Sequence, residues 1–195
     1  MAGESSAGRT YHHGDLRRAL LSAAVEAIGE YGPTALSLRD LARRAGVSHA
    51  APAHHFGDKA GLLTALAAEG FNTLADDLSQ VTRETGSLLE TGVAYLRFAI
   101  EHRAHFEVMF RPDLHRSDDA ELVAAQRRAG EALSAGVATL PAAPSGLDAR
   151  FAGLSAWSIV HGFATLWLAG ALPDDVVGPD PESAGRVVLQ RLFPD

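Results

Sequence analysis

The spacing of apolar residues is the feature that most constrains this chain, because it follows the period of an α-helix. Within residues 15–30, apolar side chains recur at steps of three and four, namely Leu16, Ala19, Leu20, Ala23, Ala24, Ala27 and Ile28. Such steps place side chains on one stripe of a helix. Alanine, the best helix former, supplies 36 of the 195 residues, and few β-branched residues alternate as they do in a strand. The sequence therefore predicts an all-α fold.

Glycine and proline divide the chain into further predicted helices. Gly32 followed by Pro33 should end the first helix, as glycine does at many helix C-termini. After the segment 37–55, a long helix is expected, with Asp58 as its cap and Gln80 near its end. Helical periodicity then covers about residues 88–102, 104–110, 118–140, 147–171 and 183–193, separated by Pro112, a loop at 141–146 and the prolines between 173 and 181.

The absence of cysteine excludes disulfides, cysteine-type zinc sites and a cysteine nucleophile. Residues 1–10 lack the apolar core of a signal peptide, and no apolar run approaches the roughly 18 residues of a membrane span. A cytoplasmic protein without a membrane partner is expected. The motifs that bind nucleotides or carry out hydrolysis are missing, so we predict no cofactor and no enzymatic activity, with a dispersed catalytic site as an alternative.

The charge is unevenly distributed along the chain. The net charge is −7, but residues 1–65 hold seven bases against six acids, together with five histidines, whereas residues 66–195 hold ten bases against eighteen acids. Local charge, rather than the total, determines where a polyanion can bind. A nucleic acid would therefore bind the N-terminal part, although its balance of +1 is a weak signal.

Two short helices separated by a tight turn are predicted within residues 37–55. Ser37 is a suitable N-cap for the first, Asp40 favours its N-terminal turn, and Gly46 ends it. Ser48 is expected to cap the second, which runs to about His55. This is the geometry of a helix-turn-helix, whose second helix can enter the major groove of DNA. A corner between two helices of an ordinary helical core is the alternative.

Residues 36–63, which read LSLRDLARRAGVSHAAPAHHFGDKAGLL, resemble the N-terminal DNA-binding domain of TetR-type transcriptional repressors. The resemblance covers about residues 12–65, with Leu-Ala-x-x-Ala-Gly-Val-Ser and His-Phe-x-x-Lys-x-x-Leu-Leu at the family's spacing. It implies a flexible arm at 1–11, a helix-turn-helix head at 12–65, and a regulatory and dimerisation domain at 66–195. It also implies a homodimeric repressor that binds a palindromic, double-stranded DNA operator and responds to a small-molecule effector.

The resemblance assigns residues 37–45 to a supporting helix and residues 48–55 to the recognition helix. The DNA-binding residues that it implies are Ser37, Arg39, Ser48, His49, Ala50, Ala51, His54, His55 and Lys59. Lys59, the only lysine of the chain, falls where the family places a phosphate-contacting lysine. Alanine allows a close approach, and its methyl group can contact a thymine methyl. Solvated surface charges are the alternative for Lys59, Arg39 and Arg43.

Two residues depart from the family pattern in the recognition helix. Ala53 stands where many relatives have a tyrosine, which removes a phosphate contact. Pro52 has no amide proton, so it must lie in the first turn or distort the helix. Five histidines could replace part of the lost contact and are hypothesised to strengthen DNA binding when protonated: His12, His13, His49, His54 and His55.

Two groups of aromatic residues mark the C-terminal part. Residues four apart share a helix face, so the candidate ligand-pocket residues are Phe98, His102, Phe106, Phe110, Trp157 and His161. The segment Trp157-Ser-Ile-Val-His161-Gly162 is similar to the signature of a TetR subgroup with a Trp-His-Gly regulatory domain, which implies an inducer site here. A purely structural, hydrogen-bonded His161 is the alternative.

The best metal-like group consists of Glu101, His102, His105 and Glu107. Two histidines without a third spaced ligand are more typical of ordinary side chains, so no metal site is predicted. The runner-up interpretation of the whole chain is a helical metal- or small-molecule-binding protein that does not bind DNA.

Dimerisation is predicted from the last two long helices. Within residues 147–171, the apolar residues nearly encircle the helix: Leu154, Ile159, Val160, Phe163, Leu166 and Leu168. A helix that is apolar on most sides must be covered on most sides. A second copy of the chain is the expected cover, packed on this helix and on the one at 183–193.

Overall fold

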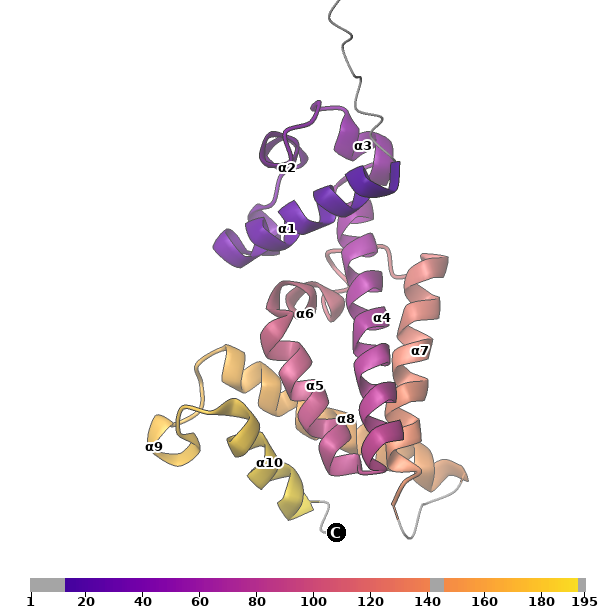
Figure 1. Ribbon diagram of the computed structural model, residues 1–195, viewed down its shortest axis with the longest axis vertical. Helices are drawn as coiled ribbons and strands as arrows, with labels where there is room; N and C mark the ends of the chain where they lie inside the picture. The colour runs from indigo at the N-terminus through magenta and orange to yellow at the C-terminus, as the bar shows by residue number, and fades with distance from the viewer. Residues whose placement is uncertain (1–12, 141–145, 193–195) are drawn as a thin grey trace, which may run out of the picture. The chain divides into compact units, whose positions relative to one another are not determined.

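The computed structural model describes residues 13–140 and 146–192, and the predicted arm and His12 lie outside them. This described part folds into ten α-helices without a strand, so the all-α prediction is confirmed (Figure 1). Its contacts divide it into two compact units, one up to Leu62 and the other from Leu63 onward. The boundary falls inside the helix α4 (Lys59–Thr85).

The N-terminal unit is built on α1 (His13–Ala35), whose apolar stripe is buried as the spacing predicted. Leu20, Ala24 and Ala27 are fully buried, whereas Ala19 is exposed at the edge of the stripe. Gly32 breaks the helix with a φ of 78° and a ψ of 164°, and a short helical turn follows from Pro33. A positive φ is readily adopted by glycine alone, which confirms the predicted end of the regular helix.

Two further helices complete this unit, α2 (Leu38–Arg44) and α3 (Ala51–Phe56). Ser37 is the N-cap of α2, because its Oγ accepts the Asp40 N–H at 3.2 Å, as predicted. Gly46 has a φ of 65° and turns the chain, and the Val47 N–H donates to the Ala42 carbonyl at 3.0 Å.

The start of α3 corrects the predicted boundary. Residues 48–51 form a turn in which the Ala51 N–H donates to the Ser48 carbonyl at 3.0 Å, and the helix begins at Ala51 rather than at Ser48. Ser48 is therefore not its cap, and Ala50 takes that position without a side-chain hydrogen bond. Pro52 explains the shift, because its fixed φ and missing N–H suit the first turn of a helix.

The helix α4 begins where Asp58 caps it, since the Gly61 N–H donates to Asp58 Oδ1 at 2.8 Å. It continues to Thr85, beyond the expected end near Gln80. Its apolar residues Leu66, Leu74 and Leu78 are buried.

Six helices follow α4 in the C-terminal unit: α5 (Leu88–Glu101), α6 (Arg103–Met109), α7 (Ala120–Val137), α8 (Gly146–Leu168), α9 (Asp174–Val177) and α10 (Pro181–Leu192). The central helix α5 packs against α7, α8 and α10, and most of its side chains are buried. Arg97 of α5 forms a bidentate ion pair with Glu182 of α10 at 2.8 and 2.7 Å. The short helix α9 was not predicted, because prolines and glycine surround it.

One side of α8 remains uncovered in the single chain. Val160 and Ala164 are buried, but Phe151 and Leu166 are 59% and 47% exposed. Among the described residues, α8 is also the one helix long and apolar enough to cross a membrane by length and composition, over Asp148–Leu168. No unbroken apolar run of that length occurs in it, because Gly, Ser and Thr interrupt the segment, but its average hydropathy is high enough for this test. A core helix of a soluble protein passes the same test.

Candidate nucleic-acid interface and ligand cavity

The turn before α3 presents its side chains to solvent. Ser48, His49 and Ala50 are exposed, as are Ala53 and His54 farther along the helix. On the opposite side, α3 is anchored by two buried residues, Pro52 and Phe56, and the Arg17 guanidinium lies 5.5 Å from the centre of the Phe56 ring. Within its own unit, the N-terminal end of α3 therefore faces outward, as it must in a helix that contacts base edges.

The other predicted DNA-binding residues are also at the surface of this unit. Ser37 and Arg39 are exposed, whereas Ala51 and His55 are half-buried. The Ser37 Oγ accepts the Asp40 N–H, and its own hydroxyl proton can still be donated to a phosphate. These locations are compatible with the predicted roles.

A hydrogen-bonded network centred on Asp40 braces α2 against α1, and sequence reasoning missed it. Asp40 accepts hydrogen bonds from the Tyr31 hydroxyl at 2.7 Å, from Arg44 Nε at 2.8 Å, and from Arg43. Arg44 also forms a bidentate pair with Glu30, at 2.8 and 2.6 Å. These bonds, led by the one from Tyr31, hold the pKa of Asp40 well below its usual value. Arg43 and Arg44 are thus engaged within the protein, which leaves Arg39 as the better candidate for a phosphate contact from α2.

Lys59 lies at the first turn of α4 and is half-buried. Its Nζ donates to the Thr34 carbonyl at 2.5 Å, which ties the ammonium group to the end of α1. An ammonium has three donors, so this bond leaves two for a phosphate. The positive end of the helix dipole adds to the attraction for an anion.

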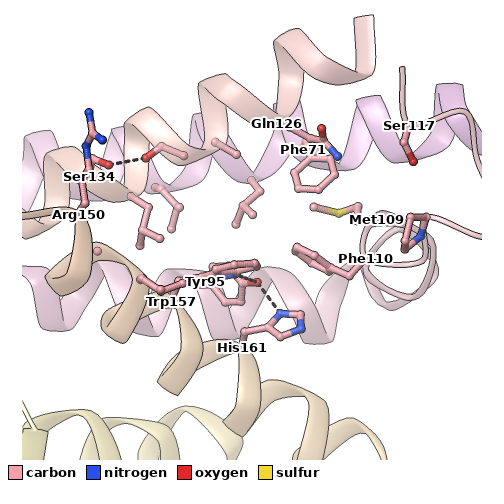
Figure 2. Close-up of a pocket in the computed structure, with 18 of the residues that line it drawn as sticks. Phe71, Tyr95, Met109, Phe110, Ser117, Gln126, Ser134, Arg150, Trp157 and His161 are labelled. Atoms are coloured by element: carbon pink, nitrogen blue, oxygen red, sulfur yellow. Dashed lines mark hydrogen bonds between the residues drawn. The ribbon is translucent and has the colours of Figure 1, made fainter. Parts of the chain in front are cut away.

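A cavity of about 910 Å³ lies inside the C-terminal unit (Figure 2). This is near the upper end of the range of about 300–1,000 Å³ for ligand pockets. Its lining comes from α4, α5, α7, α8 and the segment around α6, and most of it is apolar, including Phe71, Leu74, Leu78, Met109, Phe110, Leu133, Leu154 and Trp157. The polar side chains of the lining belong to Tyr95, His115, Ser117, Gln126, Ser134, Arg150, Trp157 and His161.

Half of the predicted pocket residues line this cavity. Phe110, Trp157 and His161 do so, but Phe98, His102 and Phe106 do not. Phe98 is buried and stacks on the His102 ring with centroids 5.0 Å apart. Phe106 packs behind the wall, 5.2 Å from the Phe110 ring and 6.2 Å from the Tyr95 ring. The prediction failed because the chain leaves helical geometry at His102, with φ −111° and ψ 39°, so residues before and after it do not share one face.

Tyr95, Trp157 and His161 form a hydrogen-bonded group in the cavity wall. Trp157 Nε1 donates to the Tyr95 hydroxyl oxygen at 3.2 Å, and that oxygen lies 2.9 Å from His161 Nδ1. Because indole can only donate, the tyrosine proton is available for Nδ1, which places the histidine proton on Nε2. Burial lowers the pKa of His161 and raises the pKa of Tyr95, so both groups stay neutral at pH 7. Tyr95 carried no sequence signal, because only the fold brings it beside α8.

The metal-like residues are arranged differently from a metal site. His105 Nε2 lies 3.3 Å from Glu69 Oε1, and the His102 and His105 rings meet edge to face at 5.8 Å. In the part of the chain that the structure describes, no three His, Asp or Glu side chains form a group that could hold a metal ion.

The head and the cavity together define an all-helical protein with a helix-turn-helix and an internal, mostly apolar cavity. Residues 20–66 match the family model of bacterial regulatory proteins of the tetR family, and residues 88–192 match the tetracyclin repressor-like C-terminal domain. The second match alone covers more than half of the chain. The chain belongs to the TetR family, whose members are DNA-binding transcription regulators, mostly repressors and some of them ligand-responsive, and not enzymes.

Known proteins resemble this chain in sequence or in fold. The structure of a protein with unknown function from Rhodococcus sp. RHA1 is 34% identical, covers 95% of this chain and 97% of its own, and has a TM-score of 0.76. The TetR family transcriptional regulator PfmR from Thermus thermophilus shares the fold at 22% identity, with 89% of this chain and 96% of its own covered and a TM-score of 0.66. The HTH-type transcriptional regulator BetI from Rhizobium meliloti (strain 1021) is 36% identical over 81 residues, which are 42% of this chain and 40% of BetI.

Proposed function

We propose that this chain is a homodimeric repressor that binds a palindromic operator and leaves it when a small molecule occupies the cavity. The observation that carries the DNA-binding part is the exposed turn that leads into α3, formed by Ser48, His49 and Ala50. It is held by Pro52 and Phe56 on the inner side. The regulatory domain would belong to the subgroup with the Trp-His-Gly signature, and the protein would act in the cytoplasm without catalysing a reaction.

The uncovered face of α8 supports the proposed dimer. Phe151 and Leu166 on α8 and Val187 on α10 are about half exposed or more. Large apolar side chains that recur on one face are typical of a surface that a partner covers. With a two-fold axis between the copies, the two heads would read half-sites about 34–36 Å apart, or a multiple of that distance.

The course of α4 supports a regulatory role for the cavity. One helix carries Lys59 at its start, and Phe71, Leu74 and Leu78 of the cavity wall farther along. A molecule that fills the cavity can therefore act on the same helix that carries the proposed phosphate contact. Release from DNA requires that the molecule bind the DNA-free state more tightly, because equal affinity for both states shifts nothing.

Selection of bound fragments from random duplex DNA, followed by fluorescence anisotropy on the selected site, tests this proposal. Lys59→Gln should weaken binding to every sequence and reduce the slope of log K against log salt by about one. Ala50→Ser should instead change the preference between sequences. The matched control is Arg127→Gln, an arginine of α7 whose side chain is 75% exposed.

The runner-up interpretation, a ligand-binding protein without DNA binding, predicts a different result. No sequence would be enriched in the selection, and Lys59→Gln would have no more effect than Arg127→Gln on retention of DNA. Either finding would contradict the proposed repressor.

A further inference from the structure

His115 is the least satisfied polar side chain of the cavity. It lies between α6 and α7, is 8% exposed, and lines the cavity, yet neither Nδ1 nor Nε2 has a hydrogen-bond partner among the residues that the structure describes. The next residue is fixed to α4, because the Arg116 N–H donates to Thr64 Oγ1 at 2.9 Å. A buried polar group without a partner costs free energy. The fold thus holds an unpaired imidazole in place at the cavity wall.

The charges of the lining discriminate between ligand classes. The lining residues include one arginine, Arg150, and two histidines, His115 and His161, but no aspartate or glutamate. The neighbouring Asp113 is not part of the lining, and its two carboxylate oxygens accept bonds from Arg111 at 2.9 and 2.8 Å. Among these lining residues, a ligand cation would find no opposite charge, whereas a carboxylate would find no like charge and several donors.

The polar groups of the cavity lie apart from one another. Gln126 and Ser117 lie at one end, near Phe71 and Met109, whereas Ser134 and Arg150 lie at the other (Figure 2). His115 is two residues from Ser117, on the segment that forms the first end. Arg150 is exposed, and water screens an interaction with an exposed charge. His115, which is buried, is therefore the stronger place for a charged head group.

We infer that the effector is an amphipathic carboxylic acid whose carboxylate accepts a hydrogen bond from His115, while its apolar body lies along Phe71, Leu74, Leu78 and Trp157. This inference deepens the proposed function and rests on the cavity being the effector site. His161 differs from His115, because its Nδ1 already accepts a hydrogen bond from Tyr95.

Three probes with the same ten-carbon chain test this inference: decanoate, decan-1-ol and decylamine. Trp157 and Trp167 are the only tryptophans, so the Trp167→Phe protein reports binding through Trp157 in the cavity wall. At neutral pH, decanoate should bind about tenfold more tightly than decan-1-ol, as a charge-assisted hydrogen bond would produce. Decylamine should bind most weakly of the three.

Two substitutions locate the head group. His115→Leu should remove the preference for decanoate over decan-1-ol while decan-1-ol still binds. His102→Leu is the matched control, because His102 stacks on Phe98 outside the cavity lining, and it should leave the preference intact. A preference that survives His115→Leu but is lost in Arg150→Gln would place the head group at the other end and overturn the inference.

The remaining outcomes separate this inference from the proposed function. If none of the probes changes the Trp157 fluorescence, or if the amine binds best, the inference is wrong. Binding to the selected DNA site is measured independently, so the proposed function is tested separately. If decanoate binds through His115 but no DNA sequence is ever selected, the ligand site stands and the proposed repressor fails.

Discussion

The Tyr95 hydroxyl oxygen accepts a hydrogen bond from Trp157 and lies 2.9 Å from Nδ1 of His161, so one buried oxygen joins α5 to two turns of α8. Tyr95 itself is 1% exposed. The phenol thus satisfies two polar groups that would otherwise lack partners at the edge of an apolar cavity. This arrangement makes the cavity wall dependent on a single hydroxyl group.

Replacing Tyr95 by phenylalanine should destabilise the protein by about 1–3 kcal/mol, because the Trp157 N–H and His161 Nδ1 would lose their partner while the ring remains. Urea unfolding followed by circular dichroism measures this. Tyr31→Phe is the matched control, since the Tyr31 hydroxyl bonds to Asp40 at an exposed position, and its effect should be smaller. Equal effects of the two substitutions would contradict the role assigned to Tyr95.

The stability of the protein should fall as the pH drops below about 6.5, the ordinary pKa of histidine. Burial lowers the pKa of His161 in the folded state. Below pH 6.5 the unfolded chain therefore binds a proton that the folded chain does not, so acid favours unfolding. His161→Gln should make the free energy of unfolding less dependent on pH between 5 and 7, whereas the exposed control His54→Gln should not. An unchanged slope in His161→Gln would refute this.

What could be predicted from sequence was local. The caps at Ser37 and Asp58 and the break at Gly32 depend on residues within one turn of helix, and the structure confirms all three. The start of α3 was predicted incorrectly at Ser48. Of the two outcomes expected for Pro52, a place in the first turn or a distorted helix, the structure has the first, and the helix therefore begins at Ala51.

The cavity could be predicted only in part, because its walls come from segments far apart in sequence. Phe110 and Trp157 were found from aromatic spacing, but Tyr95 and His115 join them only through the packing of α5 and the α6–α7 segment. Phe98 was assigned to the pocket by the same spacing, and it lies in the core because the helix is interrupted at His102. The side of a helix that faces a cavity is decided by its neighbours in the fold.

Asp40→Asn should reduce the ratio of specific to non-specific DNA binding. The substitution removes the charge that holds Arg43, so this arginine becomes freer to contact phosphates on any sequence. Arg44 keeps its pair with Glu30, but α2 loses the Asp40 part of its brace against α1. On unrelated DNA, the slope of log K against log salt should become steeper by about one for each phosphate that a released arginine binds. Anisotropy on the selected site and on a scrambled duplex measures the ratio of specific to non-specific binding and the salt dependence. Asp76→Asn is the control, because Asp76 of α4 pairs with Arg128 of α7 and both lie in the C-terminal unit.

Mild acidification should raise DNA affinity, as hypothesised from the histidines of the N-terminal part, of which His49 and His54 are exposed. The measurement is anisotropy at constant ionic strength between pH 6 and pH 8. The double substitution His49→Gln and His54→Gln should flatten the profile. A profile that is flat in the unmodified protein would remove this hypothesis.

Leu166→Glu should convert the proposed dimer to a monomer. Leu166 lies on the uncovered face of α8, and two copies of a glutamate brought together across a two-fold axis would be buried without a counter-charge. Sedimentation velocity at micromolar concentration would measure the change in mass, and circular dichroism should show that the helices persist. Val176→Glu on α9 is the control, because Val176 is 75% exposed and lies outside the proposed interface. If Leu166→Glu remains dimeric, or if Val176→Glu dissociates the dimer instead, the interface lies elsewhere on the chain. Monomers should also lose most of their affinity for a palindromic site, since the second head then binds without the advantage of being tethered to the first.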